Sequence, residues 1–124
     1  QSQDIDDSLR YAGRIQHAIM PNLDSLKRWF PESFILYITG KPYSGDWYWV
    51  HSTGRSVMVA VADCSGEGVP AAFLSVLGDS LLDEIAHRRG HLHPAELLTE
   101  LDALLRQALR RSRGLGAASE PSAG

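Results

Sequence analysis

The sequence predicts an α/β fold of the α+β type, in which an antiparallel β-sheet packs against helices. Three short segments are rich in aromatic and β-branched residues, as strands are. Elsewhere the apolar residues recur every three or four positions, as they do along one face of a helix. The 124 residues, 44% of them hydrophobic, are enough for one core and too few for two. We therefore expect one compact unit.

The charge and the cysteine content exclude several classes of protein. The formal net charge of −3 gives no general reason to expect nucleic-acid binding. Cys64 is the single cysteine, which excludes an internal disulfide and fits a reducing compartment. No apolar run approaches the roughly 20 residues of a membrane span, and no signal peptide opens the chain. We expect a cytoplasmic protein.

Residues 4–20 predict an amphipathic helix that ends before Pro21. Its apolar stripe is thin and includes Ala12 beside Gly13. Such a helix packs on a partner or continues an upstream coiled coil, or it covers its own domain. Because Gln1 is not a natural initiator, we expect a segment before it. The stripe consists of Ile5, Leu9, Ala12, Ile15 and Ile19.

The three predicted strands are residues 33–39, 46–51 and 56–63. The Ser-Thr-Gly-Arg sequence at residues 52–55 supplies a turn between the last two. Two strands joined by so short a turn form an antiparallel hairpin. The hairpin is therefore the predicted centre of the sheet.

A turn centred between Thr53 and Gly54 would place Asp46 opposite Val61 and diagonally across from Asp63. The Cβ atoms of diagonal neighbours are at most about 7–8 Å apart. Both carboxylates would then lie on one face, whereas a one-residue slip would separate them. Both faces are apolar, so both should be covered. One face carries Asp46, Tyr48, Val50, Val57, Val59, Val61 and Asp63, and the other carries Trp47, Trp49, Met58, Ala60 and Ala62.

The second half of the chain predicts two helices. After a glycine-containing turn, Pro70 suits the first position of a helix whose apolar stripe ends near Gly90. Another helix begins at His93-Pro94 and carries leucines through Leu109. From Arg113 onward Gly, Ala, Ser and Pro dominate, which predicts a disordered tail.

Asp46 and Asp63 predict a metal site. Each stands close to a glycine, Gly45 or Gly66, where the backbone of a neighbouring segment can approach. Carboxylates without an adjoining Cys or His cluster suit hard cations such as Mg²⁺ or Mn²⁺ better than zinc. Such cations serve metal-dependent phosphate chemistry. In the alternative, each Asp makes only local hydrogen bonds at a strand end or a turn.

The segment Gly66-Glu67-Gly68 could instead cradle a phosphate with its backbone N–H groups. It lacks the Gly-Lys-Ser/Thr ending of a P-loop, so a turn that passes close to another group is the safer interpretation. Cys64 could be a nucleophile near a helix N-terminus. Because no Cys-x5-Arg loop follows it, we favour a buried strand-end residue that lends its backbone carbonyl.

The histidines and tryptophans have ordinary explanations. His87, His91 and His93 stand around a glycine with no cysteine beside them, which favours solvated loop side chains over a zinc site. Trp47 and Trp49 could stack on bases, but no basic residues are interleaved with them. We expect both to be core aromatics.

Three runs of residues occur in an order and spacing that match a known family. They are Asp4-x-x-x-Ser8-Leu9-Arg10-Tyr11-Ala12-x-Arg14-Ile15-Gln16-x-Ala18-Ile19-Met20-Pro21, then Tyr43-Ser44-Gly45-Asp46-Trp47-Tyr48-Trp49-Val50, then Val59-Ala60-Val61-Ala62-Asp63-Cys64-Ser65-Gly66-Glu67-Gly68-Val69-Pro70-Ala71-Ala72-Phe73-Leu74-Ser75. Over residues 4–109 the chain resembles the SpoIIE/RsbU-type serine phosphatases of the PPM (type 2C-like) superfamily of metal-dependent protein phosphatases.

The resemblance implies a cytoplasmic bacterial signalling enzyme. Such an enzyme removes phosphate from serine or threonine of a partner protein, often an anti-sigma-factor antagonist, with two Mn²⁺ or Mg²⁺ ions. It implies that Asp46 and Asp63 are catalytic metal ligands and that Cys64 binds metal through its main-chain carbonyl. It also implies that residues 4–20 join an upstream sensor domain and support a homodimer. The helix that begins at Pro70 corresponds to one that controls metal binding.

Two departures from the family pattern qualify this expectation. Glu67 stands where the family usually has histidine, which adds a negative charge beside Gly66 and Gly68. The chain also lacks the later strands and further Asp ligands of a complete domain, so it predicts a partial sandwich. We expect a linker and dimerisation helix at 1–21, the N-terminal half of the phosphatase domain at 22–112 and a tail at 113–124. The alternative is a catalytically inactive regulatory or dimerisation module derived from that domain.

Overall fold

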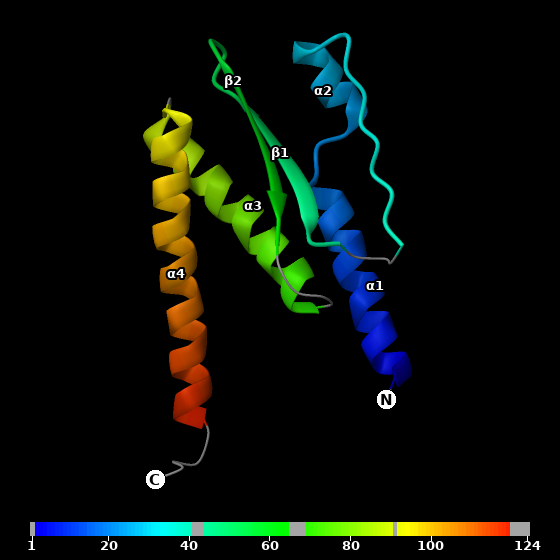
Figure 1. The fold of residues 1–124 in the computed structure, drawn as a ribbon, viewed down its shortest axis with the longest axis vertical. Helices are drawn as coiled ribbons and strands as arrows, with labels where there is room; N and C mark the ends of the chain where they lie inside the picture. Colours follow the sequence, from blue (N-terminus) through cyan, green and yellow to red (C-terminus); the bar gives the residue numbers. More distant parts are fainter. Residues whose placement is uncertain (1, 41–43, 65–68, 91, 120–124) are drawn as a thin grey trace.

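The computed structural model describes residues 2–40, 44–64, 69–90 and 92–119. The architecture is mixed α/β with an antiparallel sheet against helices, as the sequence predicts (Figure 1). In chain order the elements are α1 (Ser2–Ile19), α2 (Leu23–Trp29), β1 (Asp46–Ser52), β2 (Val57–Asp63), α3 (Val69–Arg89) and α4 (Pro94–Ser119).

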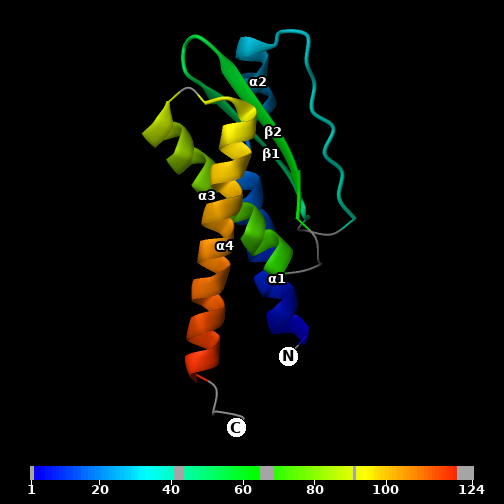
Figure 2. The same ribbon diagram turned by 60° about the vertical axis from the view of Figure 1, so that its left-hand side comes forward.

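Helix α3 lies at the centre of the packing. It contacts α1, α4 and strand β1, and β1 pairs with β2. Figure 2 shows the hairpin between these helices and the extended segment that follows α2. One face of the hairpin therefore lies on helices, and the other faces that extended segment.

The two tryptophans of β1 form the contact with the helices. Trp47 and Trp49 are 4% and 3% exposed, which confirms that they are core aromatics. A Cβ atom on Gly78 of α3 would lie only 2.7 Å from Cζ2 of Trp47, so the helix meets the indole where it has no side chain. The indole N–H of Trp49 donates to Oδ1 of Asp83 at 2.7 Å. Around them the buried core contains Met20, Leu82, Ile85, Ala86, Leu92 and Leu97.

The register of the hairpin differs from the predicted one by two residues. Asp46 pairs with Asp63 and Ser52 with Val57, so the loop has four residues in place of two. Thr53 stabilises this longer loop in two ways. Its side-chain Oγ1 accepts from the N–H of Ser56 at 3.1 Å, and its backbone N–H donates to the Ser56 carbonyl at 3.0 Å. A shift of two residues keeps every side chain on its predicted face.

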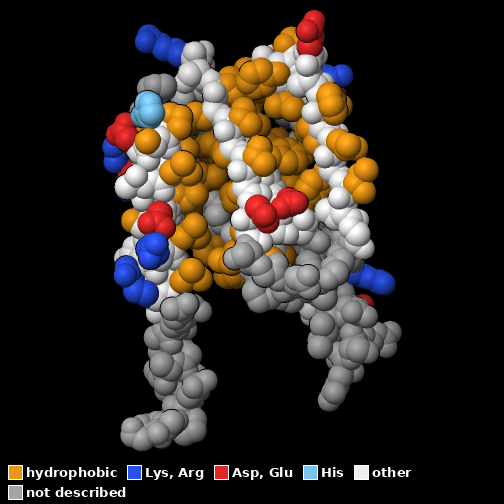
Figure 3. Space-filling view, in the orientation of Figure 1, with side chains coloured by type: hydrophobic (Ala, Val, Ile, Leu, Met, Phe, Trp, Pro, Cys, Tyr) orange, Lys and Arg blue, Asp and Glu red, His pale blue; other side chains and the backbone are white. Residues whose placement is uncertain are grey.

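The expectation that both hairpin faces are covered is wrong for the face opposite the tryptophans. Val59 is 53% exposed and Val61 is 84% exposed. Residues 33–39, predicted as a strand, run extended but pair with no strand in the described part of the chain. Their composition suits a strand, but a strand also needs a neighbouring strand with which to form backbone hydrogen bonds. Figure 3 shows hydrophobic side chains gathered over this face. The exposed hydrophobic residues of the hairpin are Val59 and Val61, and those of the extended segment are Phe34, Leu36 and Ile38.

Two helix ends agree with the sequence. Helix α1 stops before Pro21, and α3 ends at Arg89 before Gly90, whose φ of 68° is the left-handed conformation that glycine adopts easily. Helix α2 was not predicted, although Asn22 caps it by accepting from the Ser25 N–H at 2.8 Å. Its seven residues are too short for a clear periodic signal.

Helix α4 continues to Ser119, which corrects the predicted tail at residues 113–124 for its first seven residues. Extending an existing helix requires far less free energy than starting one. Residues 120–124 lie outside the described part. None of the described helices is both long enough and apolar enough to cross a membrane.

Asp79 is a buried acid on the inner side of α3. It is 9% exposed, and burial together with the nearby charge of Asp83 raises the pKa of Asp79 to about 6. The folded chain therefore binds a proton at Asp79 more tightly than the unfolded chain does. The ionised form of Asp79 makes the native state less stable.

We predict that replacing Gly78 by alanine lowers the free energy of unfolding by about 1–3 kcal/mol, because the new methyl group overlaps the ring of Trp47. This steric cost exceeds the gain in helix propensity, which is about 1 kcal/mol. Urea unfolding followed by circular dichroism measures the difference. Gly40→Ala is the control, since nothing lies within 4 Å of its Cβ position. Equal stability of the two variants would contradict the close contact.

We predict that Asp79 makes stability depend on pH. The stability that protonated Asp79 contributes to the native state is fully present below its unfolded pKa of 3.8. It declines as the pH rises to about 6 and is lost above that value. Asp79→Asn removes this dependence, so the variant gains stability relative to the wild type between pH 4 and pH 7. Urea midpoints at several pH values measure it. Asp102→Asn, on an exposed face of α4, is the matched control.

Candidate metal centre

The carboxylates of Asp46 and Asp63 lie side by side at the open end of the hairpin. Asp46 is the first residue of β1, Asp63 is the last of β2, and the two are direct partners across the strands. Directly opposed residues have Cβ atoms about 4.5–5.5 Å apart, closer than the predicted diagonal arrangement. Both residues are exposed. The structure therefore brings the pair together more closely than the sequence predicts.

The two carboxylates perturb each other. Asp63 raises the pKa of Asp46 above its ordinary value, first through a hydrogen bond between the side chains and then through charge repulsion. None of the ion pairs found among the described residues includes either aspartate. Like charges directly opposite each other destabilise a strand pair. A bound cation would remove that repulsion.

The backbone is tightly packed beside this pair. The N–H of Cys64 donates to the Gly45 carbonyl at 2.8 Å. A Cβ atom on Gly45 would lie 2.3 Å from the Cys64 carbonyl oxygen and 3.3 Å from Oδ1 of Asp63. Only glycine fits so close an approach. The Cys64 carbonyl and the Asp63 carboxylate therefore both lie close to Gly45, and the role of the carbonyl as a metal ligand stays a prediction.

The thiol of Cys64 is not prepared for nucleophilic chemistry. It is half-buried, and burial raises the pKa of the Cys64 thiol, as do the charges of Asp63 and Asp46. A reactive cysteine needs the opposite shift. This environment favours the interpretation of Cys64 as a structural residue that offers its carbonyl.

The turn before Asp46 is held by a residue that we did not single out from the sequence. Gln16 of α1 is 1% exposed, and its Oε1 accepts from the Ser44 N–H at 3.0 Å. Its Nε2 donates to the Ser44 carbonyl and, at 2.9 Å, to Oγ of Ser75. Where the structure describes burial along α1, at residues 7, 8 and 10–19, Gly13 and Gln16 are the most buried. They lie beside the predicted stripe, in which Ala12 and Ile15 are only half-buried. The position of Gln16 next to Ile15 of this stripe was the sequence feature that could have indicated its burial.

Part of the predicted site lies outside the described residues. Gly66, Glu67 and Gly68 belong to that part, and their placement in the site stays a prediction. Within the described ranges, no group of three or more His, Cys, Asp or Glu side chains could hold a metal ion. The described donors are two carboxylates and one carbonyl, all hard oxygen ligands. This donor type fits Mg²⁺ or Mn²⁺, with other oxygens completing the coordination shell.

The histidines do not form a second site in the described structure. His87 Nδ1 contacts the Asp83 carbonyl at 2.9 Å, whereas His93 Nδ1 accepts from the Ala95 N–H at 3.2 Å. His91 lies outside the described residues. His87 lies within α3 and not in the predicted loop, whereas His93 precedes the first residue of α4. Both side chains are exposed, and their separate backbone contacts favour solvated histidines over a zinc site.

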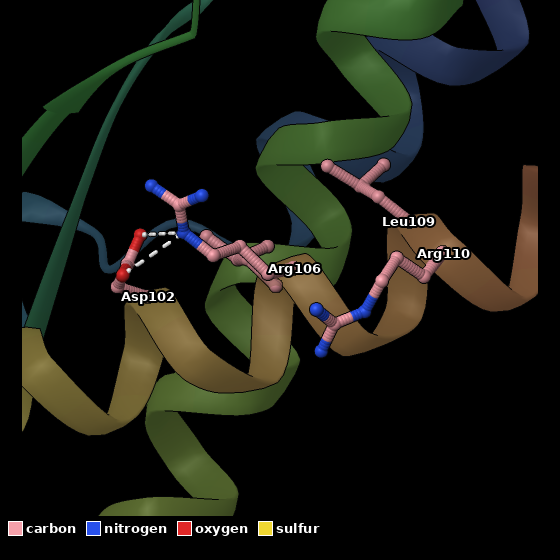
Figure 4. Close-up of a pocket in the computed structure, with 5 residues that line it drawn as sticks. Asp102, Arg106, Leu109 and Arg110 are labelled. Atoms are coloured by element: carbon pink, nitrogen blue, oxygen red, sulfur yellow. Dashed lines mark hydrogen bonds and ion pairs between the residues drawn. The ribbon is translucent and has the colours of Figure 1, made fainter.

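Among the surface hollows of the described structure, one lies on the hairpin and another on α4. One, of about 570 Å³, runs along the open hairpin face and includes both aspartates. The other lies on α4 alone, where Asp102 and Arg106 point toward each other (Figure 4). Because every residue that lines it belongs to one helix, it is a helix surface and not an enclosed site. Its residues are Asp102, Leu105, Arg106, Leu109 and Arg110.

Comparison with known proteins identifies the family. The family model described as Stage II sporulation protein E (SpoIIE) matches residues 53–118. The solved SiaA-PP2C domain of Pseudomonas aeruginosa is similar, with 34% sequence identity and a TM-score of 0.73. The alignment covers 86% of this chain but 43% of that structure, so the chain spans less than half of the matched domain. No curated protein matches the chain.

The paired aspartates, the glycine that closes the turn beside them and both comparisons lead to one assignment. The chain belongs to the SpoIIE family and has the fold of part of a PP2C-type phosphatase domain.

Proposed function

We propose that this chain contributes the first part of a metal-dependent serine/threonine phosphatase site, with Asp46 and Asp63 as metal ligands. The direct pairing of two exposed carboxylates at the end of the hairpin carries the proposal. Family membership supports the reaction class, since it relates the chain to phosphatase domains. The substrate would be a phosphoserine or phosphothreonine protein in a bacterial signalling pathway, an anti-sigma-factor antagonist among the candidates.

In this proposal each residue has a defined task. Asp46 and Asp63 hold Mn²⁺ or Mg²⁺ from two adjacent strands, and the Cys64 carbonyl adds a neutral oxygen donor. The cations, when bound, neutralise phosphate charge and lower the pKa of water for attack on phosphorus. Gly45 keeps the backbone close enough for this donor set. Glu67, four residues after Asp63 in the sequence, would add a further negative charge to this segment.

The remaining segments have proposed tasks as well. Residues 22–112 would form the phosphatase part, and residues 1–21 would link it to an upstream sensor domain in the cytoplasm. Helix α1 would also support a homodimer through residues 4–20. Helix α1 packs directly on α3, the next helix after Asp63 in the chain, so a movement of α1 would be felt by α3.

We predict that Asp46→Asn and Asp63→Asn each weaken Mn²⁺ binding by at least about tenfold and abolish Mn²⁺-dependent hydrolysis of an aryl phosphate by this chain, because each removes an anionic ligand. Isothermal titration calorimetry measures the affinity. Asp63→Asn should also lower the pKa of Asp46 toward its ordinary value, which carbon NMR of the carboxylate reports.

Asp102→Asn is the matched control, because Asp102 is an exposed aspartate that pairs with Arg106 on α4. It should bind Mn²⁺ as the wild type does. Wild-type affinity in both hairpin variants would mean that the aspartates make only local hydrogen bonds, and would overturn the metal site.

A catalytically inactive interaction module is the second candidate function, and the open hairpin face favours it. An apolar face of this kind is a common mark of an interaction surface. We expect Val61→Lys, at an 84% exposed position, to reduce any self-association seen by light scattering without loss of stability. Arg55→Lys in the exposed hairpin loop is the control. A wild-type chain that is monomeric and still turns over phosphate would count against this candidate.

A further inference from the structure

The side-chain amide of Gln16 joins three parts of the fold. It comes from α1, forms two hydrogen bonds with the backbone of Ser44 and one with the hydroxyl of Ser75 on α3. Ser75 is fully buried, and its hydroxyl donates onward to the Ala72 carbonyl at 2.7 Å. Gln16 thus uses both its carbonyl and its amino group at a buried junction.

The contact with Ser44 reaches Asp46 through two short steps. The Oγ of Ser44 accepts from the Asp46 N–H at 3.0 Å, so the serine also fixes the backbone at the start of β1. On the other side, the Gly45 carbonyl accepts from the Cys64 N–H. The turn is therefore held by α1 through Ser44 and by the end of β2 through Gly45.

Burial makes this arrangement selective for an amide. The junction needs an acceptor for the Ser44 N–H and donors for the Ser44 carbonyl and the Ser75 hydroxyl. Among uncharged side chains of this length, only the amide of glutamine supplies one acceptor oxygen and two N–H donors at the same end. Methionine would fill the space without either group, and an ionised glutamate could not donate.

We infer that Gln16 is a positioning residue for the metal centre, which holds the Ser44–Asp46 turn so that Asp46 faces Asp63. This inference rests on the proposed function of the two aspartates. In this role Gln16 acts through Ser44, which its side chain contacts, and not as a metal ligand. Removing a group that orients a metal ligand without binding the metal itself commonly weakens metal affinity by about 10- to 100-fold.

The test compares Gln16→Met with the wild-type chain by two measurements that need no turnover. Amide hydrogen exchange, read by NMR, reports whether the Ser44 N–H loses protection relative to the amides of the β1–β2 ladder. Calorimetric titration with Mn²⁺ reports the affinity. We expect selective loss of protection at Ser44 and an affinity about 10- to 100-fold weaker than that of the wild type.

A matched variant separates positioning from general stability. Ile85→Val removes one methyl group from the core and should lower stability while it leaves Ser44 protection and Mn²⁺ affinity unchanged. Should Gln16→Met fail to fold, Ser75→Ala removes only one partner of the amide. It should weaken Mn²⁺ binding in the same direction by a smaller factor.

The outcomes distinguish this inference from the proposed function. A Gln16→Met chain that binds Mn²⁺ as tightly as the wild type, or an Ile85→Val chain that weakens binding equally, overturns the positioning role alone. A wild-type chain that binds no Mn²⁺ overturns both the metal site and the inference.

Discussion

The hydrogen bond from Cys64 to Gly45 closes the open end of the hairpin, and the position of the carboxylate pair depends on it. It forms at a point where only glycine fits, and it sets the last residue pair of the ladder, Asp46 with Asp63. Any side chain at Gly45 would push the Cys64 carbonyl away and separate the strand ends. The local geometry of two adjacent residues thus decides whether two donors on different strands can act on one ion.

The two faces of the hairpin are unequal, and this follows from which side chains meet a helix. Trp47 packs on α3 at Gly78, where the helix offers a gap for the indole. The opposite face presents Val59 and Val61, and the extended residues 33–39 leave it largely open. An open apolar face is consistent with a chain that spans 43% of the matched domain. Covering this apolar face with further protein would remove it from water, which is favourable through the hydrophobic effect.

Periodicity predicts the two faces of the hairpin, because these depend on short-range spacing alone. It predicts the buried face of α3 poorly, since Phe73 of the apolar stripe is 64% exposed whereas Ser75 and Asp79 are buried. The register needed more, since the side-chain hydrogen bonds of Thr53 lengthen the loop by two residues. The proposed strand at 33–39 failed because a strand also requires a neighbour, which composition does not reveal. Gln16 was missed because a polar residue in a helix usually faces water, and its partners lie 28 and 59 positions away. The aspartate pair survived these errors because a two-residue slip preserves the face.

The carboxylate pair is also where the sequence departs from what would stabilise a hairpin most. Opposite charges or two apolar residues would favour the end pair, yet Asp46 faces Asp63 and has a raised pKa as a result. Local rules are usually broken at functional sites, where another part of the fold compensates. Here the compensation is visible in Gln16 and Gly45, which hold the turn from both sides. Two like charges held together in this way are the arrangement that the proposed cation site requires.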